Sequence, residues 1–134
     1  MKRASAIAAA VILAALAAGI AFGSGSAAKV TVAEKEWGVA PAPKTAKSGK
    51  ITFVAKNIGK LSHEFVVLKT STPATKLKLK GAKAVETGFV ARTPQFKPGQ
   101  TKTLTLTLKA GHYVLICNLP GHYQAGQRVD FTVK

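Results

Sequence analysis

The residues from Cys117 to Gln127, together with a histidine further upstream, offer donor atoms that suit a transition metal. Four residues separate Cys117 from His122 and four more separate His122 from Gln127, so one short loop can direct three side chains to one point. The other histidine, His63, stands in the segment HEFVVL and must come from a different strand. Copper prefers a soft thiolate with two imidazoles, and a weak fourth donor completes the trigonal geometry of electron-transfer sites. The sequence therefore predicts a copper site made by His63, Cys117 and His122, with Gln127 as the axial donor.

Each of these residues also has a simpler interpretation. A single cysteine is often a small buried hydrophobe, and a single histidine is more often held by structural hydrogen bonds than by a metal. The joint spacing, with Pro120 and Gly121 directly before His122, favours the metal site. For Gln127 the alternative stays open. It could face water, which would leave copper with three ligands or with a backbone carbonyl as the fourth.

At these residues the chain resembles the cupredoxins, the small blue copper proteins of the plastocyanin and azurin type. The resemblance covers about residues 29–134 and is weakest between residues 70 and 96. It implies a Greek-key β-sandwich that binds one copper ion, cycling between Cu(I) and Cu(II). The residues that carry the resemblance are Asn57, Ile58, Gly59, His63, Glu64, Phe65, Lys97, Pro98, Gly99, Gln100, Gly111, His112, Tyr113, Leu115, Cys117, Pro120, Gly121 and His122.

The chain departs from the family pattern at two positions. The axial ligand of the family is usually a methionine, but the only methionine is Met1. Gln127 stands where that methionine would be and is similar to the axial glutamine of the stellacyanin-like branch. Glu64 stands where many relatives carry an asparagine after the first histidine, so the hydrogen bonding around the thiolate is expected to differ.

The N-terminal segment has the pattern of a secretory signal peptide. Lys2 and Arg3 precede an apolar stretch from Ala4 to Phe22, and small residues then run to Ala28. We expect residues 1–28 to be the leader, cleaved after Ala28 or, alternatively, kept as a membrane anchor. Residues 29–134 then form a single domain in the periplasm or outside the cell. A lone cysteine cannot form an intramolecular disulfide there, and copper ligation explains it.

The chain is strongly basic, with 20 lysines and arginines against five acidic residues. Such a charge favours anionic partners, either acidic redox proteins or an anionic membrane surface. Export and the lack of a basic-aromatic motif argue against nucleic acid. Lysines that only keep a monomer soluble are the alternative. The densest group comprises Lys76, Lys78, Lys80 and Lys83.

Apolar residues alternate along the chain with a period of two, which is typical of strands with one buried face. This pattern, with frequent Gly and Pro turns, predicts an all-β fold, an antiparallel β-sandwich. The resemblance to the cupredoxins implies that its strands are connected as a Greek key. Residues 70–96 fit either an edge strand through Leu77 and Leu79 or a short helix within residues 74–86. The rows expected to face the core are Ile51, Phe53 and Ala55; Leu104, Leu106 and Leu108; Tyr113, Leu115 and Cys117; and Val129, Phe131 and Val133.

Two further aromatic or histidine side chains are expected to be structural. Alternation places His112 on the face opposite Cys117, pointing outward, and Trp37 is interpreted as a core or edge-packing aromatic. The family resemblance implies a ring of apolar residues around His122 that excludes water and offers a docking patch. Its members would be Leu119, Pro120, Tyr123 and Ala125.

Two function classes remain. The first is a one-electron carrier between redox partners, and the second is an exported protein that stores or delivers copper. Delivery usually needs exposed, exchangeable thioether ligands, which the predicted mature chain lacks, so the carrier is favoured. An enzyme is not expected, because four protein ligands leave no open position for a substrate.

Overall fold

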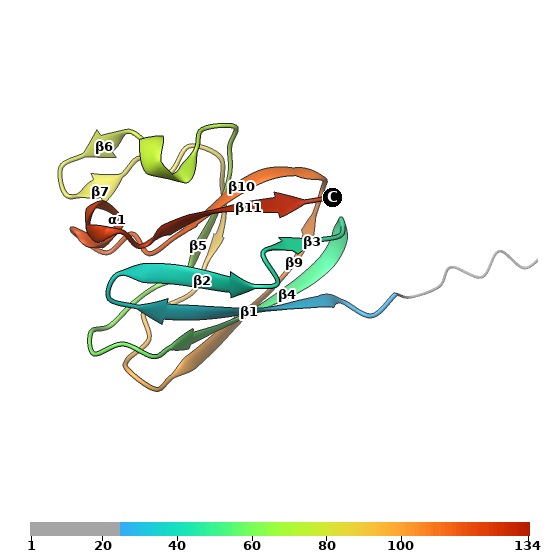
Figure 1. Cartoon of the computed structure of the whole chain (residues 1–134), viewed down its shortest axis with the longest axis horizontal. Helices are drawn as coiled ribbons and strands as arrows, with labels where there is room; N and C mark the ends of the chain where they lie inside the picture. Colours follow the sequence, from blue (N-terminus) through green and yellow to red (C-terminus); the bar gives the residue numbers. More distant parts are fainter. Residues whose placement is uncertain (1–24) are drawn as a thin grey trace, which may run out of the picture.

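Two β-sheets pack face to face in the computed structural model, which describes residues 25–134 (Figure 1). The predicted leader falls almost entirely on residues 1–24, which lie outside the described residues. The first sheet has the strand order β2 (Gly38–Ala42), β1 (Ala28–Lys35), β4 (Gly49–Asn57) and β9 (Thr101–Leu108). The second has the order β3 (Thr45–Ala46), β11 (Arg128–Val133), β10 (Gly111–Ile116), β5 (Val66–Lys69) and β8 (Phe89–Arg92).

Alternating side chains from both sheets meet in the core, as the period of two predicts. In β4, Ile51, Phe53 and Ala55 are fully buried, while the threonines of β9 are exposed on the other side of their strand. Phe53 packs against Phe65 and Phe131, with ring centroids 5.4 and 5.6 Å apart. Burying each such side chain contributes about 1.5–3 kcal/mol, so this cluster holds the two sheets together.

The predicted β-sandwich is confirmed, but its sheets are mixed rather than purely antiparallel. β1 pairs in parallel with β4, and β3 pairs in parallel with β11. After β2 the chain leaves the first sheet, pairs briefly through β3 with the second, and returns through β4 in the direction of β1. Parallel neighbours need such a crossover, and the alternation pattern carries no information about it.

Residues 70–96 combine parts of both predicted alternatives. They hold one 3-10 turn, η1 (Ala74–Lys76), a small hairpin of β6 (Leu79–Lys80) and β7 (Lys83–Ala84), and then β8. The expected helix is therefore a single turn, and Leu79 lies in a strand while Leu77 does not. This segment covers the outer face of the second sheet, and Ala74 and Ala84 pack there in a second apolar cluster with Val66, Leu68, Val114, Ile116 and Tyr123.

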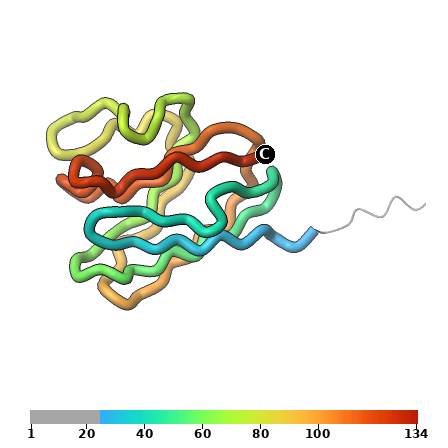
Figure 2. The backbone as a smooth tube through the Cα atoms, viewed as in Figure 1, coloured from blue at the N-terminus to red at the C-terminus, as the bar shows by residue number. Residues whose placement is uncertain are grey.

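Because this segment covers β10 from outside, both faces of that strand are buried. Every residue from Tyr113 to Cys117 is at most 1% exposed. The tube in Figure 2 shows the segment lying beside the C-terminal strands. Cys117 thus follows a strand that is fixed from two sides.

No helix within residues 25–134 is long and apolar enough to cross a membrane.

His112 ties this outer segment to the second sheet, as its predicted structural role requires. Its Nε2 lies 2.8 Å from Asp130 Oδ1, and its Nδ1 contacts the carbonyl oxygen of Thr70. The same Asp130 oxygen accepts a 2.8 Å hydrogen bond from the Ala74 N–H. The Thr70 carbonyl, followed by Asp130, raises the pKa of His112 above its usual value.

Candidate metal centre

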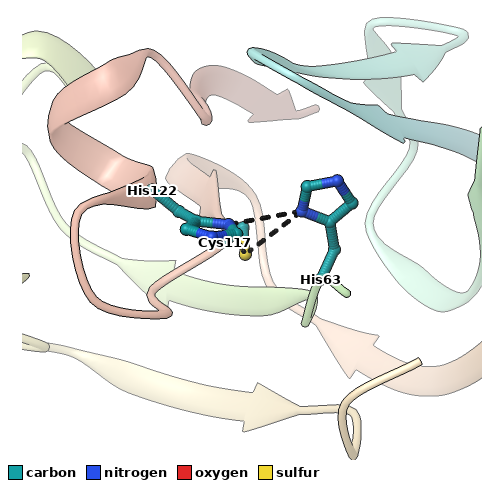
Figure 3. Close-up of side chains that lie close together, drawn as sticks. All are labelled: His63, Cys117 and His122. Carbon is teal, nitrogen blue, oxygen red and sulfur yellow. Dashed lines mark hydrogen bonds between the residues drawn. The ribbon is translucent and has the colours of Figure 1, made fainter. Parts of the chain in front are cut away.

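The three predicted donors meet at one end of the sandwich, each delivered by a different kind of element (Figure 3). His63 lies between β4 and β5, where its backbone forms a two-way bridge with Phe96, with N···O distances of 3.1 and 2.9 Å. Cys117 follows the last residue of β10. His122 begins the short helix α1 (His122–Ala125). Residues 54 positions apart in the sequence are therefore joined at one point by the packing of the sheets.

The ligand atoms are spaced as a metal would require. His63 Nδ1 and His122 Nδ1 are 3.3 Å apart, and Cys117 Sγ lies 3.4 Å from His122 Nδ1 and 3.9 Å from His63 Nδ1. A metal at the centre of a trigonal plane, with bonds of about 2.0–2.3 Å to nitrogen and sulfur, needs donors about 3.5–3.8 Å apart. The residues present therefore fit one metal ion, and a thiolate with two imidazoles is the set that copper prefers.

The sulfur is enclosed by protein. Cys117 is 0% exposed, and the Glu64 N–H donates a 3.4 Å hydrogen bond to its Sγ. Burial raises the pKa of the thiol to about 12. Since the thiolate is the metal ligand, binding must displace this proton, and the Glu64 N–H then stabilises the negative sulfur. The Glu64 side chain itself turns away toward Arg92, 3.7 Å from its guanidinium.

Gln127 lies at the site and does not face water. It is 0% exposed, and its Oε1 lies 2.8 Å from His122 Nδ1. Its Nε2 donates a 2.8 Å hydrogen bond to Glu34 Oε2. Burial raises the pKa of Glu34 to about 9, so this carboxyl is neutral at pH 7. The hydrogen bond to Glu34 fixes the orientation of the Gln127 amide, so that its oxygen points to the His122 imidazole. Its burial contradicts a water-facing Gln127, and its role as the axial ligand stays a prediction.

A carboxylate fixes the orientation of the His63 ring. Glu36 Oε1 lies 2.7 Å from His63 Nε2, which leaves Nδ1 directed at the other donors. Backbone N–H groups of Lys60 and Leu61 donate to the same carboxylate at 2.8 and 2.9 Å. The Lys60 N–H is the main cause that lowers the pKa of Glu36 to about 2. A carboxylate in this position fixes a metal-binding histidine and raises its basicity.

Neither Glu34 nor Glu36 was predicted from the sequence to act at the site. A signal for Glu34 was present, because it continues the inward row of Val30 and Val32 in β1. An acidic residue at an inward position needs a partner or a raised pKa. For Glu36 no comparable signal existed, since it follows the end of the strand and meets His63 only through the fold.

The surroundings of His122 differ from the predicted apolar ring. Trp37 is 45% exposed rather than buried in the core, and its ring stands edge-on to His122 with centroids 5.0 Å apart at 81°. Tyr123 is 3% exposed and belongs to the second apolar cluster, where its hydroxyl donates to the Ala74 carbonyl at 2.6 Å. Trp37, and not Tyr123, therefore offers an exposed aromatic ring beside His122, which agrees with its interpretation as an edge-packing aromatic. Pro120 and Ala125 are exposed as expected.

Comparison with known proteins shows which solved structures share this fold. No family model matches the sequence, and no curated protein matches it. Among solved structures, the chain is similar to the dithionite-reduced auracyanin from Roseiflexus castenholzii, at 25% identity and a TM-score of 0.61 over 82% of this chain and 99% of that one. It is also similar to auracyanin A, a blue copper protein from Chloroflexus aurantiacus. The identity is 21% and the TM-score 0.59, over 79% of this chain and 98% of that one. A third similar structure is rusticyanin from Thiobacillus ferrooxidans. The identity is 21% and the TM-score 0.63, over 83% of this chain and 79% of that one.

Proposed function

We propose that this protein, which has the cupredoxin fold, is an exported one-electron carrier that holds one copper ion through His63, Cys117 and His122. The observation that carries the proposal is the convergence of one buried thiol and two imidazoles within 4.8 Å. Bound there, copper would supply the Cu(I)/Cu(II) couple. Export is proposed from the signal-peptide pattern of residues 1–28, either with cleavage or with retention as an anchor.

The chain's own contacts suit repeated electron transfer. His63 is held by Glu36 and by the Phe96 bridge, while Cys117 is held by a strand buried on both faces. Donors fixed by protein contacts move little when the charge at their centre changes, and this keeps the barrier to electron transfer low. Trp37 at the edge of His122 restricts the access of water.

We further propose that Gln127 is the axial ligand. The support is its burial and its contact with Glu34, which presents the amide oxygen to the site. With Gln127 in place, protein donors surround the metal position and leave no open side for a substrate, so we infer a carrier rather than an enzyme. Storage or delivery of copper is the less favoured function, because Cys117 and His63 are both 0% exposed and cannot readily hand a metal on.

The visible spectrum of the Cu(II) protein tests the proposal. A copper-thiolate bond gives an intense charge-transfer band, which copper bound to surface histidines does not give. Cys117→Ser should abolish the band while the far-UV circular dichroism of the β fold stays unchanged. His112→Gln, which removes a histidine outside the site, is the matched control and should keep the band. A band that survives in Cys117→Ser would contradict the assignment.

A further inference from the structure

Four exposed lysines form what we call the basic hairpin face, on η1, the β6–β7 hairpin and the link between them. None of the four makes a salt bridge within residues 25–134. Two acidic residues lie near this face: Glu64 and Glu86 both pair with Arg92, and Glu64 also interacts electrostatically with Lys83. With Arg92, five cationic side chains stand against these two carboxyl groups, so the face keeps a net positive charge. The face consists of Lys76, Lys78, Lys80 and Lys83.

Apolar groups are exposed in the middle of these charges. Leu79 is 48% exposed and Val85 is 38% exposed. Two hollows, of about 290 and 400 Å³, adjoin one another at Val85. Lys76 and Lys78 line the first hollow, and Lys80 and Lys83 line the second. An apolar centre with a charged rim is the composition of a protein-binding surface.

The hairpin is hydrogen-bonded directly to the loop that carries the metal donors. Asn118 accepts from the Ala84 N–H at 2.9 Å and donates to the Ala84 carbonyl at 3.0 Å. The Gly121 N–H donates to the Ala82 carbonyl at 2.8 Å. Asn118 follows Cys117 in the chain, and Gly121 precedes His122. In Figure 1, β6, β7 and α1 accordingly lie together at the end of the molecule opposite the C-terminus.

We infer that the basic hairpin face is the docking surface for an acidic redox protein, which exchanges electrons with the metal centre across this hydrogen-bonded contact. The inference rests on the proposed electron-carrier function. The excess of lysines would attract the partner, and Leu79 and Val85 would contact it. In the exchange the partner's centre loses one electron and the copper gains it, and no covalent bond forms or breaks. An acidic protein with protruding side chains suits a hollowed face better than a flat membrane does.

Stopped-flow reduction of the Cu(II) protein by a reduced plant-type [2Fe–2S] ferredoxin, an acidic one-electron donor, tests the inference. The variant carries Lys76→Glu, Lys78→Glu and Lys80→Glu, which leaves Lys83 in place beside Glu64. The control carries the same charge change at exposed lysines at the far ends of the strands, away from Cys117. The three control substitutions are Lys47→Glu, Lys50→Glu and Lys109→Glu.

At low ionic strength we expect the second-order rate constant to fall at least tenfold in the hairpin variant and less than threefold in the control. Both should keep the visible band, which shows that the copper site is intact. Equal decreases in the two variants would overturn the docking surface and leave net charge as the cause. Loss of binding to phosphatidylserine vesicles in the hairpin variant, with an unchanged ferredoxin rate, would overturn it in favour of a membrane surface. A wild-type Cu(II) protein that ferredoxin cannot reduce would instead contradict the electron-carrier function.

Discussion

At the scale of single residues, carboxyl groups from other parts of the chain orient two of the side chains at the metal centre. His63, Cys117 and His122 are marked by their spacing, and the structure places all three together. Glu34 and Glu36 act on Gln127 and His63 across contacts between separate strands and loops. A linear sequence does not show which carboxylate will meet which donor. Only the inward position of Glu34 in its strand hinted at a special role.

The orientation of Gln127 leads to a prediction about the reduction potential. An amide oxygen is a harder donor than a thioether, so it favours Cu(II) over Cu(I). Gln127→Met should therefore raise the potential, and each tenfold change in the equilibrium corresponds to about 59 mV in voltammetry. Gln124→Met, at an exposed position of α1 three residues before Gln127, is the control and should leave the potential unchanged. An unchanged potential in both Gln127→Met and Gln127→Ala would exclude Gln127 as a ligand.

At the scale of elements, long alternating strands were predictable and short packed segments were not. β4, β9 and β11 carry clear alternation and lie where the sequence predicts them. η1, β6 and β7 are two or three residues long, too short to show any period. Their positions are set by packing of Ala74 and Ala84 on the second sheet and by hydrogen bonds to Asn118. The parallel pairing of β1 with β4 likewise depends on the path of the chain through space.

The link between His112 and Asp130 should make the stability of this outer segment depend on pH. A histidine whose pKa is raised on folding stabilises the folded state below its unfolded pKa of about 6.5, and this stabilisation is lost as the pH rises through the folded value. His112→Gln should therefore destabilise the protein more at pH 5.5 than at pH 9. Because both groups are partly exposed, we expect a pH-dependent difference of about 1 kcal/mol or less.

Urea unfolding of wild type and variant at the two pH values measures this difference, and the contributions of other titrating groups cancel. Asp130→Asn should weaken the same pH dependence, since it removes the carboxylate that faces the imidazole. A destabilisation by His112→Gln that is equal at both pH values would show that the hydrogen bonds matter and the charge does not.

At the scale of the whole molecule, the metal centre is formed where the two sheets and their loops converge. β1 supplies Glu34, the residue after it is Glu36, and the loops next to β5, β10 and β11 supply the donors. The sequence predicts this convergence because His63 lies far along the chain from Cys117 and His122. Because protein contacts already fix each donor, we expect the fold to form without the metal and a bound metal to stabilise it further.

Removal of copper should accordingly lower the melting temperature and leave the fold intact. A ligand that binds only the folded state adds about 2.7 kcal/mol at a free concentration of 100 times its Kd. A domain of this size gains about 4–8 °C per kcal/mol, so copper should raise the melting temperature by about 10–20 °C. Differential scanning calorimetry of the apo and copper forms measures the shift, with Cys117→Ser as the control that should show little of it. The backbone amide NMR signals of the apo and Cu(I) forms should differ only for residues near the metal donors. Differences spread over both sheets would contradict a metal centre that the protein fixes in advance.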